Sequence, residues 1–456
     1  MEKVLQNRLK NLIEKDFVRF HYPGHKGRKG GFDPALSFLL DYTETYGTDN
    51  LLHPEEILCQ SQKLAAESFQ TLDTFYGVGG STMAIYAGIF ALAQEGEEIL
   101  IQRNCHKSVY QGALLRKSRV HTLSPEYDEE GDVLLGISTE KLEKFLQENP
   151  KISLLVLTNP SYYGVILPLK EQIDLAHKYG VGVLVDEAHG AHLPLSHRRE
   201  DSALAHGADI VVHSAHKSLG ALTQTALLHR NSERISRERV LEMISLFTST
   251  SPSYLFMTSI EASIGKAVEW KKKDWENLEK QIEDFKNKAQ ELGYEFYKAP
   301  KSPYVGGLDF LKIFFRYPGY SGEELSDIFY EKGINFEMSD GSYLLGVLSS
   351  FTTEEDLNRC LRVMSEIPKR EGKYPKSAYI PLENKKEKEM YEAKEWEGEW
   401  VPISESLHRI SKHFVFQYPP GVPLLLPGER ISEKHIEIFE KNRGIYGIER
   451  GRVKVL

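Results

Sequence analysis

Short, nearly continuous runs of apolar residues recur between about residues 77 and 252. Three of them span residues 98–101, 153–157 and 182–185. Uninterrupted apolar runs of this length are typical of strands that are covered on both faces. Stretches with helical spacing, such as residues 170–178, separate the runs. The pattern therefore predicts βαβ units and a mainly parallel sheet covered by helices.

The remaining chain divides around this predicted large domain. Residues 20–27 hold too many turn formers for a regular element, and residues 55–70 have the pattern of a helix. Residues 261–291 are charged with helical spacing and predict one long helix, and residues 295–370 alternate strand and helix patterns again. We expect an N-terminal segment at 1–60, a large domain at 61–285, a small α/β domain at 286–370, a charged connection at 371–398 and a C-terminal domain at 399–456.

Composition narrows the possible partners. The 456-residue chain has a net charge of −9 with acidic and basic residues interspersed, which argues against a nucleic-acid partner. Its three cysteines, Cys59, Cys105 and Cys360, lack the spacing of a metal site or a disulfide framework. Neither a signal-peptide pattern nor an apolar run of membrane-spanning length is found. We expect a soluble, cytoplasmic protein without a bound metal.

Two polar motifs follow predicted strands and carry candidate chemistry. Asp186 ends the apolar run 183–185, and Lys217 lies in the turn Ser214–Lys217 after another apolar run. Taken alone, Lys217 is interpreted as a surface lysine and Asp186 as a helix N-cap. Together they are what a pyridoxal 5'-phosphate (PLP) enzyme needs: a lysine for the Schiff base, and an acid that keeps the pyridine nitrogen protonated.

Further motifs suit the phosphate and the ring of PLP. Gly79–Thr82 opens an apolar helix, where backbone N–H groups and the hydroxyls of Ser81 and Thr82 can bind a phosphate. Ser214 and His216 flank the lysine and can reach the same phosphate. His106 follows the run 98–101 and can stack on the pyridine ring, and His189 can orient Asp186 or contact the ring hydroxyl.

Several ordered motifs resemble the ornithine/lysine/arginine decarboxylase family of fold-type I PLP enzymes. The resemblance runs from about residue 18 to 430 and is that of the short form, which lacks a receiver-like N-terminal wing. The motifs that carry it are Phe20–Lys26, Arg103–Ser108, Thr158–Gly164, Asp186–His192, Ser214–Lys217 and Tyr418–Pro423.

This resemblance implies roles for the matching residues. Lys217 would form the Schiff base, Asp186 would pair with the pyridinium, His106 would stack on the ring, and Ala188 would pack against its other face. The phosphate would be held by Ser81, Thr82, Ser214 and His216. Ser251 would come from a neighbouring subunit, so a homodimer or larger homo-oligomer with a shared active site is expected.

The implied reaction is α-decarboxylation of arginine, lysine or ornithine to the amine and CO2, with Lys217 as a candidate acid for the α-carbon. Glu429 is the candidate for binding the substrate's distal cation. It is interpreted equally well as an N-cap or first-turn acid of a helix near residues 432–433. Two alternatives stay open. One is an aminotransferase or related lyase, for which Arg316 could bind the substrate carboxylate, and the other is a catalytically impaired homologue that only binds PLP.

Overall fold

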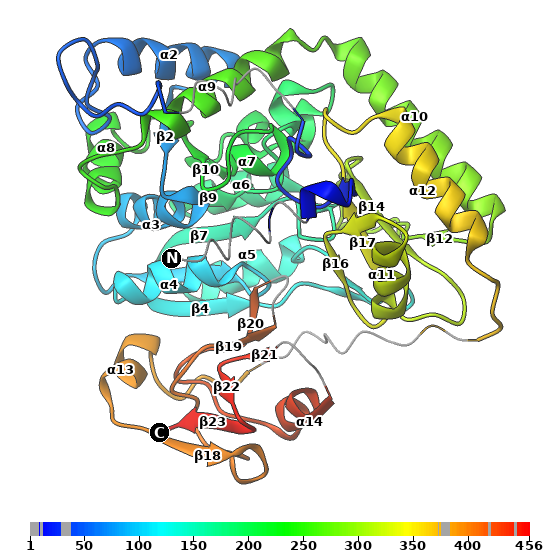
Figure 1. The fold of residues 1–456 in the computed structure, drawn as a ribbon. Coiled ribbons are helices and arrows are strands. Elements are labelled where there is room, and N and C mark those ends of the chain that lie inside the picture. Colours follow the sequence, from blue (N-terminus) through cyan, green and yellow to red (C-terminus); the bar gives the residue numbers. More distant parts are fainter. Residues whose placement is uncertain are drawn as a thin grey trace, which may run out of the picture.

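The computed structural model describes residues 9, 12–28, 38–372, 374, 384–417, 421–441 and 445–456. Residues 418–420 of the motif Tyr418–Pro423 lie outside the described residues, as do parts of the predicted N-terminal segment and charged connection. The described chain forms a large α/β domain, a small α/β domain beside it and a C-terminal domain below β4 (Figure 1).

The large domain is built on a seven-stranded sheet in the order β2-β11-β10-β9-β7-β3-β4. Strands β4, β3, β7, β9 and β10 run parallel, and β11 and β2 join the sheet in antiparallel pairs. The predicted mainly parallel sheet is thus confirmed, and the three predicted strands correspond to β3, β7 and β9. The strands are β2 Asp73–Gly77, β3 Glu98–Gln102, β4 Arg119–Leu123, β7 Ile152–Thr158, β9 Gly182–Asp186, β10 Ile210–His213 and β11 Ala226–Arg230.

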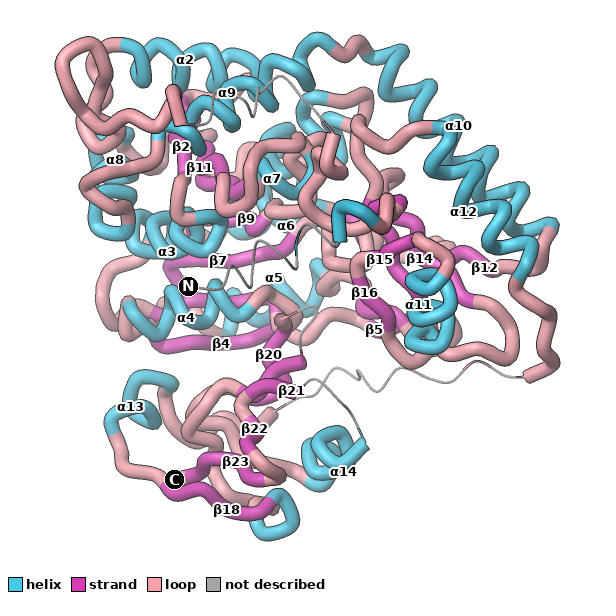
Figure 2. The backbone as a smooth tube through the Cα atoms, in the orientation of Figure 1, coloured by secondary structure: helices cyan, strands magenta, loops and turns pink. Residues whose placement is uncertain are grey.

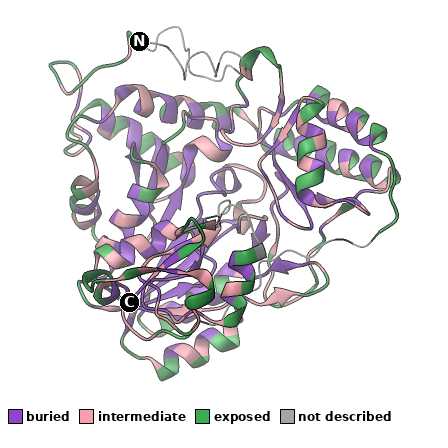
Figure 3. Cartoon of the chain, turned by 60° about the horizontal axis from the view of Figure 1, so that its bottom comes forward, coloured by how far each residue is buried: buried purple, intermediate pink, exposed green. Residues whose placement is uncertain are grey.

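The central strands are buried on both faces, as their apolar runs predict. Leu154 and Val156 of β7 pack in one hydrophobic cluster, whereas Leu155 and Leu157 pack in another on the opposite face. Figure 3 shows these buried strands enclosed by helices. The covering helices are α2 Ile57–Phe69, α3 Gly80–Leu92, α4 Lys107–Leu115, α5 Thr139–Glu148, α6 Leu169–Lys178, α8 Arg237–Phe247 and α9 Tyr254–Glu269.

The predicted long helix over 261–291 is two helices, α9 and α10 (Lys272–Glu291). The chain turns at Trp270 and Lys271, where the Lys271 N–H donates to the Asp274 carboxylate at 2.8 Å and the Trp270 ring packs 4.9 Å from the Trp275 ring. These contacts start a new helix in place of continuing the old one.

Helix α10 packs into the core of the small domain, so the predicted boundary at residue 285 falls inside a helix. Its buried residues Trp275, Ile282 and Phe285 share a cluster with Phe315 and Phe329. We therefore place the boundary before α10. The small domain also contains β12 Glu295–Phe296, β14 Lys312–Arg316, α11 Gly322–Glu331, β15 Ile334–Phe336, β16 Met338–Ser339, β17 Leu344–Val347 and α12 Glu354–Glu366.

Two connections tie the small domain to the rest of the chain. Strand β1 (Val18–Phe20) pairs in parallel with β15, so part of the N-terminal segment belongs to the small domain. Strand β13 (Gly307–Leu308) pairs with β8 (Val165–Ile166) of the large domain. Figure 2 labels β15 among the magenta strands of the small domain.

The C-terminal domain contains two three-stranded sheets, β18-β23-β22 and β20-β19-β21. It docks on the large domain through its β19–β20 end, where Lys107 N–H donates to the Gly421 carbonyl at 2.9 Å. The contact brings this domain close to the start of α4. Its elements are α13 Met390–Glu395, β18 Glu399–Pro402, β19 Val415–Gln417, β20 Val422–Leu425, α14 Glu433–Lys441, β21 Ile445–Tyr446, β22 Ile448–Glu449 and β23 Arg452–Val455.

Candidate active site

A cavity of about 250 Å³ lies where the parallel strands end. Carboxyl ends of neighbouring parallel strands meet at one edge of a sheet, which is where open α/β folds bind ligands. The cavity brings together six residues predicted as site residues from the sequence, and a seventh, Ser81, from the start of α3. The six are His106, Asp186, Ala188, His189, His216 and Lys217.

Asp186 is buried in this cavity and Lys217 is partly buried there, and each influences the charge of the other. Asp186 is the last residue of β9, and its carboxylate accepts from the Ala188 N–H at 3.2 Å. Burial raises the pKa of Asp186, and the nearby Lys217 opposes that rise. Burial lowers the pKa of Lys217, which favours the neutral amine. A protonated ring nitrogen beside Asp186 would keep its carboxylate ionised.

His189 lies between Lys217 and a tyrosine that the sequence did not single out. Its Nε2 lies 2.9 Å from Lys217 Nζ, and its Nδ1 lies 2.7 Å from the hydroxyl of Tyr22. Burial holds the pKa of His189 well below its usual value, and the charges of Lys217 and Lys312 lower it further. His189 is therefore a neutral imidazole with both nitrogens engaged.

His106 is fixed in place as the N-cap of α4. Its Nδ1 accepts from the Ser108 N–H at 3.2 Å and lies 2.8 Å from the Ser108 hydroxyl. Burial, followed by the charge of Lys217, lowers the pKa of His106 to about 3. A neutral, anchored ring on the cavity wall suits stacking on an aromatic ligand.

Groups suited to the phosphate of PLP line the cavity or lie on the turn that carries Lys217. Ser81 lies in the first turn of α3, whose free N–H groups can bind an anion, and Gly80 begins that helix with a φ of +74°. The buried Ser214 hydroxyl has no hydrogen-bond partner among the described residues. His216 lines the same cavity, and burial lowers its pKa to about 4. An orphaned buried hydroxyl near a helix start fits a phosphate group.

Thr82 and Ser251 are exposed in this single chain and do not line the cavity. Ser251 lies in a loop between α8 and α9, where its N–H donates to the Ser249 hydroxyl at 3.2 Å. Within one chain, neither residue therefore reaches the place predicted for the phosphate.

Glu429 also lies away from the cavity, contrary to the prediction that it reads a substrate cation. Its buried carboxylate pairs with Arg103 at 3.1 Å and accepts from Asn384 Nδ2 and the Leu426 N–H, each at 2.7 Å. The alternative helix N-cap role is not observed either, since the carboxylate points to Leu426 and not to α14. Glu429 instead joins the C-terminal domain to Arg103 of the large domain.

We expect Glu429→Gln to lower the melting temperature and leave the KM for substrate unchanged. The change removes a carboxylate charge beside a buried guanidinium, which commonly costs about 3 kcal/mol of folding free energy. Thermal unfolding and steady-state kinetics check this, with the exposed Glu433→Gln as control. A raised KM at an unchanged melting temperature would return Glu429 to substrate binding.

Tyr22, Tyr162 and Glu337 are among the cavity residues that the sequence analysis did not predict. Glu337 lies between β15 and β16, where its carboxylate accepts from the Tyr162 hydroxyl at 2.6 Å and the Tyr22 N–H at 2.9 Å. Both tyrosines lie in motifs that carry the family resemblance, so those motifs were the available signal. Glu337 lies in none of these motifs and enters the site from the small domain.

The segment that carries Tyr22 packs tightly on the lysine turn. Gly24 N–H donates to the His216 carbonyl at 2.8 Å, and a Cβ at Gly24 would lie 2.6 Å from the Lys217 carbonyl oxygen. Only glycine allows this approach. The glycine-rich segment 20–27 therefore supports the turn that positions Lys217.

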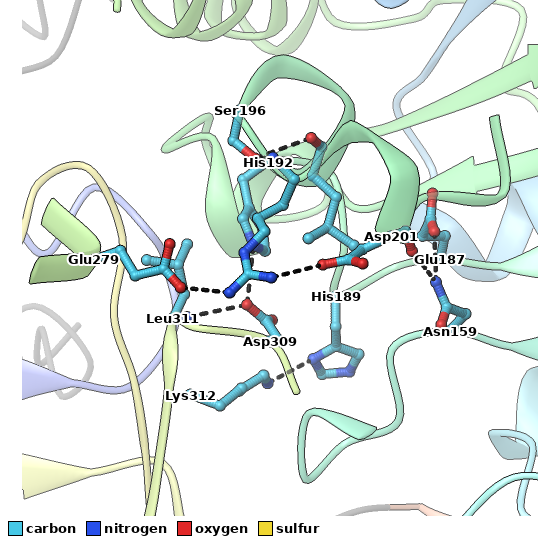
Figure 4. A network of polar contacts seen from close by, with 12 residues as sticks. Asn159, Glu187, His189, His192, Ser196, Asp201, Glu279, Asp309, Leu311 and Lys312 are labelled. Carbon is cyan, nitrogen blue, oxygen red and sulfur yellow. Dashed lines mark hydrogen bonds and ion pairs between the residues drawn. The ribbon is translucent and has the colours of Figure 1, made fainter. Parts of the chain in front are cut away.

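A buried network fixes the turn after Asp186. The Glu187 carboxylate accepts from Asn159 Nδ2 at 2.8 Å and from the Ser202 hydroxyl at 2.6 Å, and lies 2.8 Å from His213 Nε2 (Figure 4, in part). Since strand β10 ends at His213, the network joins the ends of β7, β9 and β10. It holds in register the two strands that carry Asp186 and lead into Lys217.

Among the described residues, no cluster of three histidine, cysteine or carboxylate side chains has the arrangement of a metal site. Within the same residues, no helix is both long and apolar enough to cross a membrane.

The chain matches two family models along most of its length. Residues 4–317 match the Orn/Lys/Arg decarboxylase major domain, and residues 376–441 match the C-terminal domain of the same family. An arginine decarboxylase from Bacillus subtilis is 32% identical over 97% of this chain and 94% of its own length.

Solved structures have the same fold. Lysine decarboxylase A from Pseudomonas aeruginosa superposes with a TM-score of 0.78 at 16% identity, over 99% of this chain and 81% of that one. Sphingomonas wittichii serine palmitoyltransferase superposes with a TM-score of 0.58 at 19% identity, over 77% of this chain and 86% of that one. The predicted fold-type I architecture is confirmed. By the match of both domain models and of a relative over nearly its whole length, the chain belongs to the Orn/Lys/Arg decarboxylase family.

Proposed function

We propose that this protein binds PLP through Lys217 and removes the α-carboxylate of a basic amino acid as CO2. The observation that carries the proposal is one buried cavity that holds Lys217, Asp186 and His106 together with the Glu337 carboxylate. Family membership and the arginine and lysine decarboxylases among the related proteins support it.

When bound, PLP supplies an electron-accepting ring that stabilises the charge left on the α-carbon as CO2 leaves. The protein groups bind and orient around it. The lowered pKa of Lys217 favours the nucleophilic amine that attaches the cofactor, and the Asp186 carboxylate holds a proton on the ring nitrogen. His106 and Ala188 line the cavity as candidates for the two faces of the ring, and Ser81 and His216 line it as candidates for the phosphate. The buried, unpartnered Ser214 hydroxyl, on the turn that carries Lys217, is a further candidate for the phosphate.

Glu337 replaces Glu429 as the candidate for recognising the substrate's distal cation. Glu337 is the cavity carboxylate that the small domain contributes, whereas Asp186 belongs to the large domain. A cation in a buried site needs a carboxylate or an aromatic partner, and Tyr22 and Tyr162 lie beside Glu337. The arrangement favours an amino acid with a positively charged end.

The aminotransferase alternative finds little support in this cavity. Arg316, its candidate carboxylate ligand, contacts Glu295 at 3.2 Å and the rings of Tyr343 and Tyr374. Among the described residues, no arginine lines the cavity. Release of CO2 and formation of a keto acid distinguish the two reactions.

The proposal is tested by comparing arginine, lysine and ornithine with the uncharged analogue norleucine. We expect one of the basic amino acids to be converted to its amine and norleucine to react poorly. Equal turnover of norleucine would contradict the substrate class, and formation of keto acids would contradict the reaction.

We expect Glu337→Gln to raise the KM for the basic substrate about 10- to 100-fold, because a charge-assisted hydrogen bond contributes about 1.5–3 kcal/mol. Steady-state kinetics measure this, with the exposed Glu331→Gln as a control in the same domain. The visible spectrum of bound PLP should stay the same, so that a changed spectrum would point to cofactor binding instead. A KM equal to that of the wild type would remove Glu337 from substrate recognition.

We further propose a homodimer, or a larger assembly, in which Ser251 of one subunit serves the phosphate of the other. The exposure of Ser251 and Thr82 in the single chain is compatible with such sharing. Mixing the inactive Lys217→Ala protein with Ser251→Asp, whose added charge repels a phosphate, should restore part of the activity, because a hybrid dimer holds one intact site. Full activity of a monomer in sedimentation experiments would reject the shared site.

A further inference from the structure

A chain of hydrogen-bonded side chains leads away from Lys217 to the buried Lys312. Lys217 Nζ lies 2.9 Å from His189 Nε2, and His189 Nδ1 lies 2.7 Å from the Tyr22 hydroxyl. Lys312 Nζ donates to that hydroxyl at 2.9 Å and lies 3.2 Å from His189 Nδ1. Figure 4 shows the Lys312 side chain directed at the His189 ring. Two side chains thus connect the two lysines.

Lys312 lies between the active-site cavity and a second cavity of about 620 Å³. The two cavities share no lining residue, yet Lys312 lines the second and contacts Tyr22 and His189 of the first. The exposed Lys298 and Lys301 also line the second cavity, so it reaches the surface. Asp309 lies on its wall, where the buried Oδ2 has no hydrogen-bond partner among the described residues.

The charges around Lys312 suit a group that releases and regains a proton. Burial lowers the pKa of Lys312 to about 8, Asp309 and Glu337 oppose this shift, and Lys217 adds to it. Of the other titratable groups in contact, burial keeps His189 neutral and raises the pKa of Tyr22, and the Tyr162 ring lies 5.5 Å from the ammonium. Lys312 is therefore mostly protonated at neutral pH and close to its pKa.

A decarboxylase needs a steady supply of protons in its active site. Loss of CO2 breaks the bond from Cα to the carboxylate, and the product amine forms when a proton takes that place. Each turnover therefore consumes one proton within the cavity.

We propose that Lys312 resupplies this proton to Lys217 through Tyr22 and His189, an inference that rests on the proposed function. Lys312 donates a proton to the Tyr22 oxygen, Tyr22 passes its own hydroxyl proton to His189 Nδ1, and His189 gives its Nε2 proton to the neutral Lys217 amine. Water in the second cavity then reprotonates Lys312. Exchange of one imidazole proton with water restores the starting tautomer of His189.

Lys312→Met tests the proposal, since methionine keeps most of the side chain's length and carries no proton. We expect kcat to fall about 10²-fold or more, the usual effect of a positioned proton donor, and KM to change little. Wild-type kcat should fall as pH rises through about 8, where Lys312 loses its proton, and this decline should be missing in Lys312→Met. Lys298→Met, on the exposed wall of the same cavity, is the control and should retain the wild-type kcat and pH profile.

Two further variants separate proton delivery from charge and packing. Lys312→Arg keeps a positive charge that does not release its proton, so we expect it to be as slow as Lys312→Met. Recovery of normal kcat with arginine would overturn the relay and leave an electrostatic role. Tyr22→Phe leaves the direct 3.2 Å contact between Lys312 and His189, so kcat should fall less in this variant than in Lys312→Met.

A measurement on the apoenzyme tests the connection without any turnover. Because Lys312 lowers the pKa of His189, the ¹⁵N NMR signals of His189 should titrate at a higher pH in Lys312→Met than in the wild type. His189→Gln assigns these signals, and identical titrations in both proteins would overturn the relay. If wild-type enzyme releases no CO2 from any basic amino acid, the proposed function fails, whereas the NMR titration still decides whether the two groups are coupled.

Discussion

Replacing Lys217 with alanine is expected to abolish covalent PLP attachment and to lower turnover by about 10³- to 10⁴-fold or more, since we propose the residue as both attachment point and proton donor. Among the described residues that line the cavity, Lys217 is the one lysine. Its lowered pKa and its contact with His189 prepare the amine for this role. Absorption spectra of the purified protein and the rate of amine formation measure the effect.

Noncovalent binding of PLP can persist in this variant, because Asp186 and the residues proposed to bind the phosphate are unchanged. The matched control is Lys178→Ala, at an exposed position on α6, which should retain the absorption spectrum of bound PLP and the activity. Borohydride reduction of the wild type followed by peptide mapping locates the attachment directly. A label on Lys26 or Lys312, two buried lysines near the cavity, would contradict the assignment.

Asp186→Asn is expected to fold and bind PLP yet decarboxylate about 10²- to 10³-fold more slowly. The amide retains the shape of the side chain, and it cannot hold a proton on the ring nitrogen as a buried carboxylate does. Because burial already raises the pKa of Asp186, its ionised form depends on a positive partner within the site. Single-turnover kinetics on the PLP-loaded variant measure this loss.

The control for this variant is Asp174→Asn on the exposed face of α6, which should behave as the wild type. Unfolding curves of Asp186→Asn establish that any loss is not one of stability. Turnover near the wild-type rate would show that the carboxylate does not support the ring, and the proposed role of Asp186 would be abandoned.

The large-domain part of the site followed from the sequence because parallel strands impose it. Asp186 ends β9, and Lys217 and His106 follow β10 and β3, so strand order alone brings these residues to one edge of the sheet. Apolar runs located the strands, and the polar residues after them located the cavity.

The rest of the site depends on contacts between domains, which no local pattern encodes. Glu337 and Lys312 come from the small domain and Tyr22 from the N-terminal segment, and they meet at His189 or beside it. The prediction that Glu429 binds the substrate cation was wrong for the same reason. An acid in an apolar stretch indicates a buried partner, and that partner is Arg103 of the large domain. The helix break at Trp270 was likewise missed, since helical spacing continues on both sides of it.

The most direct test of the account follows both products of carboxyl-labelled arginine, lysine and ornithine with the PLP-loaded enzyme. We predict that at least one of them yields labelled CO2 and the corresponding amine in equal amounts, and that Lys217→Ala yields neither. Keto acid with the label retained, or consumption of none of the three by a protein that carries PLP on Lys217, would contradict decarboxylation of basic amino acids.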